Sequence, residues 1–62
     1  MKKYGIWNVT EDVQEVKNYD ANQIIEFANT ERVVVTGVQE GITTLKEAKH
    51  FLLTLGYIVE EM

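Results

Sequence analysis

The chain has 62 residues, no cysteine, no proline and a formal net charge of −4 at pH 7. A domain this short buries only about 60% of the surface that its unfolded form exposes. Without cysteine there are no disulfides and no thiolate metal sites, and one histidine, His50, cannot form a zinc cluster. Self-association is therefore the expected source of added stability. The excess of acidic over basic side chains disfavours binding to nucleic acid and favours a basic partner.

The N-terminal residues do not have the pattern of a secretion signal. Residues 1–3 are followed by Gly5 and Asn8 rather than by an apolar run, and no apolar segment reaches 18 residues. No linker, repeat or low-complexity tract divides the chain. We expect one small α+β domain over residues 1–62, in a soluble cytoplasmic protein without membrane contact.

The first predicted element is a strand over residues 3–9. Alternation places Tyr4 and Ile6 on one face of this strand, and Trp7 and Val9 on the other. A strand that is apolar on both faces is central in its sheet or has its second face masked.

Residues 13–19 allow two interpretations, the second strand of a hairpin or a helix over residues 11–18. The hairpin is favoured because Asp20 and Gln23 form a capping-box pattern, so that a new helix begins at this point.

The first helix is predicted from Ala21 to about Asn29, with a broad apolar face toward the core. That face consists of Ala21, Ile24, Ile25, Phe27 and Ala28. Residues 33–38 are rich in valine, which is typical of a strand, and we expect this strand to be central in the sheet.

The second helix is predicted to begin after Thr43 or Thr44, because Thr44 and Glu47 form another capping-box pattern. Gly56 is expected to end it in the left-handed conformation. The apolar stripe of this helix comprises Leu45, Ala48, Phe51, Leu52 and Leu55. Residues 57–59 are predicted to form a short final strand.

Together these elements predict an α+β fold, a small sheet of three to four strands with two helices, in the order β-β-α-β-α-β. The alternative is β-α-α-β-α-β, with residues 11–18 helical. Residues 33–59 would form a right-handed crossover between parallel strands if both strands share one sheet. Either the helices cover both faces of the sheet, or its open face is a surface for a partner, which we favour.

The segment from residue 37 to residue 44 joins a predicted strand to a helix start, the usual place of phosphate-binding loops. Its anion-site candidates are Gly37, Gly41, Thr43 and Thr44. It lacks the lysine of a P-loop, and Glu40 would repel a phosphate, so an ordinary turn is the favoured interpretation.

No residue pattern predicts catalysis, a cofactor or a metal site. His50 has Glu47 and Thr54 on the same helical face, yet the chain contains no serine or cysteine to act as nucleophile. The acidic pairs at residues 11–12 and 60–61 are interpreted as solvated chain turns and ends.

Aromatic and apolar residues on the strands and helices are the candidates for an interface. They are Tyr4, Ile6, Trp7, Val9, Val34 and Leu53. The leading hypothesis is a non-enzymatic, regulatory interaction module that forms a homo-oligomer, with a dimer favoured, and binds another protein through an acidic and aromatic surface. The alternatives are anion or nucleotide binding at residues 37–44, and nucleic-acid binding through Lys46 and Lys49 of the second helix.

Overall fold

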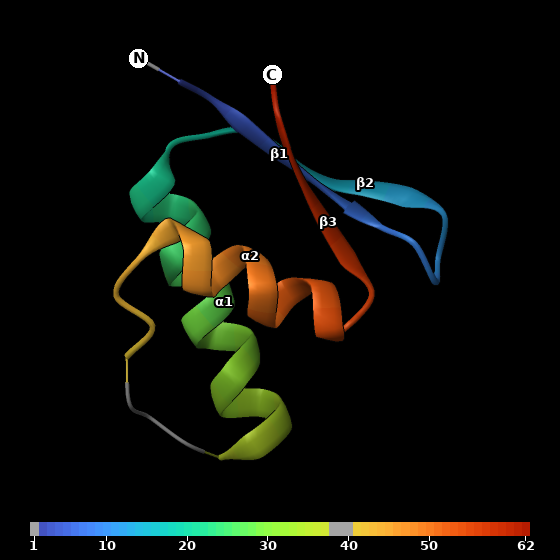
Figure 1. Ribbon diagram of the computed structural model, residues 1–62. Coiled ribbons are helices and arrows are strands. Elements are labelled where there is room, and N and C mark those ends of the chain that lie inside the picture. Colours follow the sequence, from blue (N-terminus) through green and yellow to red (C-terminus); the bar gives the residue numbers. More distant parts are fainter. Residues whose placement is uncertain (1, 38–40) are drawn as a thin grey trace.

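The central strand of the sheet is the N-terminal one. The computed structural model describes residues 2–37 and 41–62, and Figure 1 shows both helices on the same side of a three-stranded sheet. The elements are β1 (Tyr4–Asn8), β2 (Val13–Tyr19), α1 (Ala21–Thr36), α2 (Leu45–Thr54) and β3 (Tyr57–Glu61). The strand order is β2-β1-β3. The α+β class, with a small sheet and two helices, is therefore confirmed.

Burial explains why β1 lies in the middle. Tyr4 and Ile6 face the helices, and Ile6 is fully buried. Ile6 pairs with Val16 of β2 on one side and with Val59 of β3 on the other. The backbone groups along both edges of β1 thus pair with a neighbouring strand. This is the central position that the apolar character of both its faces predicts.

Residues 13–19 form the second strand of a hairpin, so the favoured interpretation is confirmed and the helical alternative is wrong. Asp12 ends the turn in the left-handed region, with φ of 57°. The side-chain oxygen of Asn8 accepts a hydrogen bond of 3.0 Å from the backbone N–H of Glu11. This local bond stabilises the turn at residues 9–12, where the alternative prediction would begin a helix.

Helix α1 begins where the capping box predicts. The backbone N–H of Gln23 donates to the Asp20 carboxylate at 2.9 Å, and the backbone N–H of Asp20 donates to the Gln23 side chain at 2.9 Å. The helix then runs to Thr36 rather than ending near Asn29.

The predicted strand over residues 33–38 is wrong, because residues 33–36 form the last turn of α1 and Val38 lies outside the described residues. Valine lowers the stability of a helix by only about 0.5 kcal/mol per residue relative to better helix formers. The surrounding structure can therefore hold a valine-rich segment in a helix. The true end of the helix is Gly37, with φ of 73°, whose N–H donates to the carbonyl of Val33 at 2.9 Å. The hydroxyl of Thr36 also donates to the carbonyl of Arg32.

Helix α2 and strand β3 begin where they were predicted. Thr44 accepts a hydrogen bond of 3.1 Å from the backbone N–H of Glu47, and Gly56 adopts φ of 92° after the helix. Strand β3 then pairs antiparallel with β1. The predicted crossover between parallel strands is therefore wrong, because its first strand is helical and its last strand pairs with β1.

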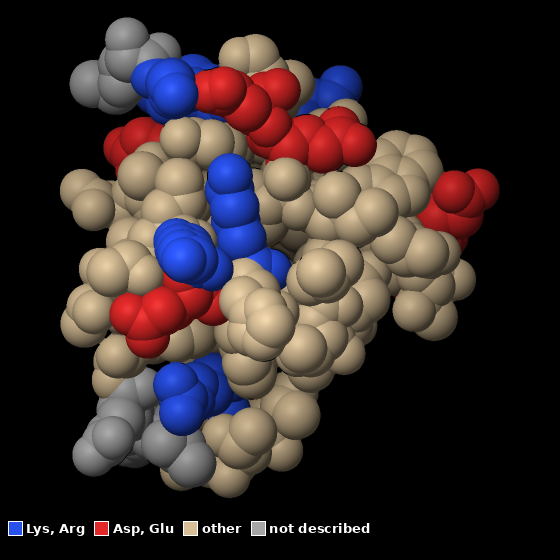
Figure 2. Space-filling model, in the orientation of Figure 1, with Lys and Arg blue, Asp and Glu red and all other residues tan. Residues whose placement is uncertain are grey.

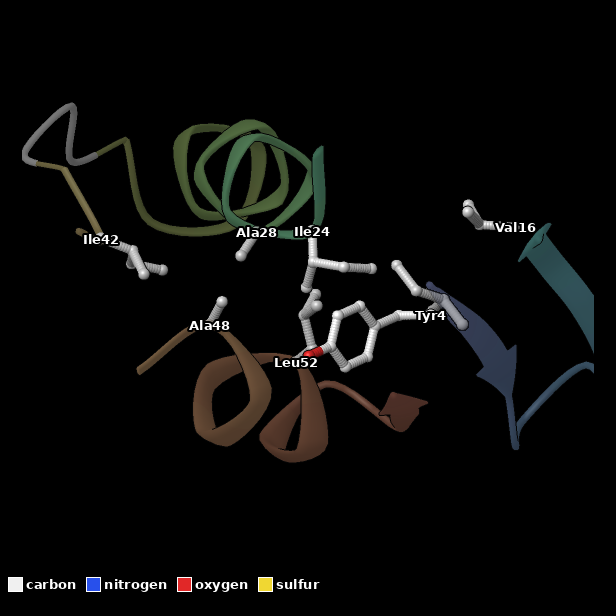
Figure 3. Close-up of a cluster of buried hydrophobic side chains, with 8 residues drawn as sticks. Tyr4, Val16, Ile24, Ala28, Ile42, Ala48 and Leu52 are labelled. Atoms are coloured by element: carbon white, nitrogen blue, oxygen red, sulfur yellow. The ribbon is translucent and has the colours of Figure 1, made fainter. Parts of the chain in front are cut away.

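A single hydrophobic core lies between the sheet and the helices. Figure 3 shows Tyr4 from β1, Ile24 from α1 and Leu52 from α2 pointing toward one another. The other buried members of this core are Ile6, Val16, Ala28, Ile42 and Ala48. Because the core lies on one side of the sheet only, the helices do not cover both faces.

Asn29 connects α1 to the segment that precedes α2. Its amide nitrogen donates to the carbonyl of Ile42 at 3.1 Å, and its amide oxygen accepts from the backbone N–H of Ile42 at 2.7 Å. This two-point bond holds the buried Ile42 side chain in the core between the helices.

We predict that Asn29→Ala lowers the free energy of unfolding by about 1–3 kcal/mol, because both backbone groups of Ile42 lose their partner in a partly buried place. Urea denaturation followed by circular dichroism measures this change. Asn22→Ala is the matched control, since Asn22 is exposed on the same helix. Equal stability of the two variants would contradict the assigned role.

Candidate functional site

An acidic groove runs between α1 and the end of β2. Its volume is about 230 Å³, and Tyr19, Phe27, Glu26 and Glu31 line it together with Gln23 and Thr30. Glu26 and Glu31 lie on α1, and Tyr19 is the last residue of β2. We call these six residues the acidic groove; it combines aromatic walls with two carboxylates.

Tyr57, the first residue of β3, adds a third aromatic ring next to Phe27 of the acidic groove. Its ring meets that of Phe27 edge to face, with ring centres 5.7 Å apart. Burial raises the pKa of the Tyr57 hydroxyl above its ordinary value of 10.0, and the carboxylates of Glu31, Glu15 and Glu11 raise it further. Three carboxylates from two elements and a turn therefore act on one hydroxyl, which marks a region of negative potential.

The carboxylates of this region are not neutralised by basic side chains. Among the residues that the structure describes, the one ion pair joins Lys2 to Glu61, at 3.2 Å. Glu15 accepts a hydrogen bond of 3.0 Å from the amide of Asn8, a neutral group. The described residues also contain no group of three or more His, Asp or Glu side chains placed to hold a metal ion.

The predicted interface residues are dispersed. Tyr4 and Ile6 belong to the intrachain core, so they offer no surface to a partner. The other four lie on separate segments, namely β1, the turn after it, α1 and α2, where they are Trp7, Val9, Val34 and Leu53. Val34 and Leu53 are the most exposed, at 76% and 61%. They do not form one patch with the acidic groove.

The open face of the sheet carries one apolar pair. Trp7 of β1 lies beside Ile58 of β3, which is 41% exposed. Gly5 lies on the same face beneath longer side chains, since a Cβ built there would lie 2.7 Å from the amide nitrogen of Gln14 and 3.2 Å from the sulfur of Met62. Trp7 is only half-buried, so the face is partly covered by its own chain and partly open.

The structure places the anion-site candidates between two helices. Gly37 ends α1 and Thr44 begins α2, so the segment joins two helices rather than a strand and a helix. Thr43 and Thr44 direct their hydroxyls to the carboxylate of Glu47, at 3.5 and 3.1 Å. A Cβ built on Gly41 would meet no described atom within 4 Å, so this glycine borders open space. The helix-to-helix connection removes the basis for the anion-site prediction, and Glu40 lies outside the described residues.

The exposed face of α2 has mixed charge. Figure 2 views the molecule from this side and shows Lys and Arg side chains beside acidic ones rather than an unbroken basic surface. Lys49 is exposed, and its ammonium lies 5.3 Å from the ring centre of Tyr4. His50 is exposed on the same helix. No helix in the described part of the chain is both long and apolar enough to cross a membrane.

Sequence reasoning missed Glu26, Glu31 and Phe27 as site residues. Phe27 was expected on the core-facing side of the helix, and it does pack against the core, half-buried, while it also lines the groove. The spacing of Glu26, Thr30 and Glu31 is the signal for a shared helical face, but it is visible only when α1 is extended past Asn29. Comparison of the chain with family models, curated proteins and solved structures finds no match.

We predict that Glu31→Gln lowers the pKa of Tyr57 toward its ordinary value, because the carboxylate disfavours the phenolate. A pH titration of tyrosine absorbance near 295 nm, with Tyr57→Phe to assign the signal, measures this shift. The folded chain retains this proton at a pH where the unfolded chain loses it, so stability falls as pH rises above about 10. Glu31→Gln makes that fall smaller.

Glu60→Gln is the control for this titration. Glu60 is exposed on β3 and is not among the charges that act on Tyr57. A shift of equal size in both variants would mean that net charge alone, rather than the acidic groove, sets the pKa of Tyr57.

Proposed function

We propose that this protein is a non-enzymatic interaction module that binds a basic, extended segment of another protein in the acidic groove. The supporting observation is the combination of two carboxylates with aromatic rings in one groove. A lysine or arginine side chain of the partner fits both features, because its charge meets Glu26 and Glu31 while its stem packs on Tyr19 and Phe27.

The size of the groove favours one or two side chains rather than a whole small molecule. Its volume of about 230 Å³ is below the range of about 300–1,000 Å³ that is typical of small-molecule sites. Glu15 and Glu11 extend the negative potential beyond it, toward the turn between β1 and β2. A second basic residue of the same segment would lie there.

The net charge of the chain supports the same class of partner. At −4 it steers basic segments toward the protein and makes association depend on salt. The proposal keeps the cytoplasmic location and the regulatory role expected from the sequence.

We predict that a short peptide of alternating glycine and arginine binds the protein, and that Glu26→Gln combined with Glu31→Gln weakens binding about tenfold, as expected for two partly exposed charge pairs. Amide chemical shifts are the measurement, with the changes expected at residues 19–31 and at Tyr57. A peptide with glutamine in place of arginine controls for charge.

Glu60→Gln is again the matched control, because it removes a carboxylate outside the groove. Its affinity for the arginine peptide is expected to stay within about twofold of the parent protein's, the loss due to net charge alone. Shifts spread over the whole surface, or equal losses in all variants, would overturn the proposal.

Self-association through the open face of the sheet is the second part of the proposal, supported by the Trp7 and Ile58 pair. Two copies that stack these faces would bury both tryptophans in a symmetric contact, which is the commonest form of dimer. The acidic groove lies between α1 and β2, on the helix side of the sheet, and stays open in such a dimer.

We predict that the protein is a dimer at micromolar concentration and that Trp7→Glu makes it a monomer without unfolding it, because Trp7 is outside the core cluster. Light scattering gives the mass and circular dichroism the folding. Leu53→Glu is the control, since Leu53 is exposed on α2. A monomer mass for the parent protein would refute this second part alone.

A further inference from the structure

A second groove lies between the two helices, apart from the acidic groove. It has a volume of about 590 Å³. Its lining includes Arg32 from α1, Ile42 from the connecting segment, and Lys46, Glu47, His50 and Phe51 from α2. We call it the interhelical groove. Its volume lies within the range of about 300–1,000 Å³ that is typical of sites for small organic molecules.

The floor of the interhelical groove is apolar. Ile42 is almost fully buried and Phe51 is half-buried, and both present carbon surface to the groove. An occupant with an aromatic or alkyl body would cover this surface and gain about 25 cal/mol for each Å² removed from water. This apolar surface by itself favours neither a positive nor a negative ligand.

The charged side chains that line the groove determine which charge of ligand it favours. Arg32 lies on α1 and Lys46 lies on α2, so one cationic group stands on each side of the groove. No carboxylate in the described part of the chain forms an ion pair with Arg32 or Lys46. Arg32 is also only partly exposed, which makes an unpaired charge there more costly than one in open solvent.

Among the described residues that line the groove, Glu47 is the one acidic residue, and its carboxylate already has hydrogen-bond partners. Its carboxylate accepts hydrogen bonds from the hydroxyls of Thr44, at 3.1 Å, and Thr43, at 3.5 Å. It also lies in the first turn of α2, where the helix dipole favours a negative charge. Arg32 and Lys46 against the single carboxylate of Glu47 give the described lining a net positive charge, although the whole chain is acidic.

We propose that the interhelical groove binds a small organic anion, an aromatic or alkyl body that carries one carboxylate. The carboxylate would pair with Arg32, whose planar guanidinium accommodates two carboxylate oxygens, and Lys46 would add a second positive charge. The apolar body would lie on Phe51 and Ile42. This inference is independent of the acidic groove, which selects the opposite charge.

The test uses 2-naphthoate as the anionic probe and 2-naphthamide as its neutral analogue of nearly equal shape. We expect 2-naphthoate to shift the amide signals of residues 32–36 and 42–54 and to bind about fivefold more tightly than 2-naphthamide, the factor expected for one charge pair. Arg32→Gln is expected to abolish this preference. Equal affinities of the two probes for the parent protein would overturn the proposal.

Lys49→Gln is the matched control, because Lys49 lies on the same helix but outside the interhelical groove. The preference for 2-naphthoate should persist in this variant. Loss of the preference in Lys49→Gln as well as in Arg32→Gln would show diffuse attraction to net charge and would overturn the proposal. Shifts at Trp7 and Ile58 in place of the helices would overturn it too. Circular dichroism of each variant confirms folding.

Discussion

Burial of Tyr4 and Ile6 on one face of β1 is the constraint on which the arrangement of the molecule depends. Side chains alternate along a strand, so their burial directs Trp7 to the opposite face. Because β1 is central, that assignment also orients β2 and β3. Both helices must then pack on the same side of the sheet, since one core cannot be shared between two faces.

The length of α1 creates the two grooves. Adjacent residues on a helix point about 100° apart, so Glu31 lines the groove toward β2 whereas Arg32 lines the groove toward α2. A helix that ended near Asn29 would carry neither residue. The extended final turns of α1 thus separate negative from positive charge across one helix, which is why the ligands we propose for the two grooves carry opposite charge.

Local signals in the sequence predicted most of the fold. Asp20, Thr44 and Gly56 mark helix ends through hydrogen bonds or backbone conformations that involve near neighbours, and these positions were correct. The valine-rich segment was misassigned because its preference for a strand is weak and its environment decides its conformation. The acidic groove could not be predicted, since Tyr19 of β2 meets Phe27 and Glu31 of α1 only when these two elements are packed together.

The first strand pairs with the last, so the sheet depends on contacts between residues far apart in the sequence. The backbone N–H of Met62 donates to the carbonyl of Lys3 at 2.8 Å, so the sheet joins residues from opposite ends of the chain. The entropy of closing a loop around both helices must be lost before this side of the sheet can form. Folding is therefore expected to be slow for a chain of this size, because high contact order delays the transition state. Detachment of β3 would remove every hydrogen bond on one side of the central strand at once.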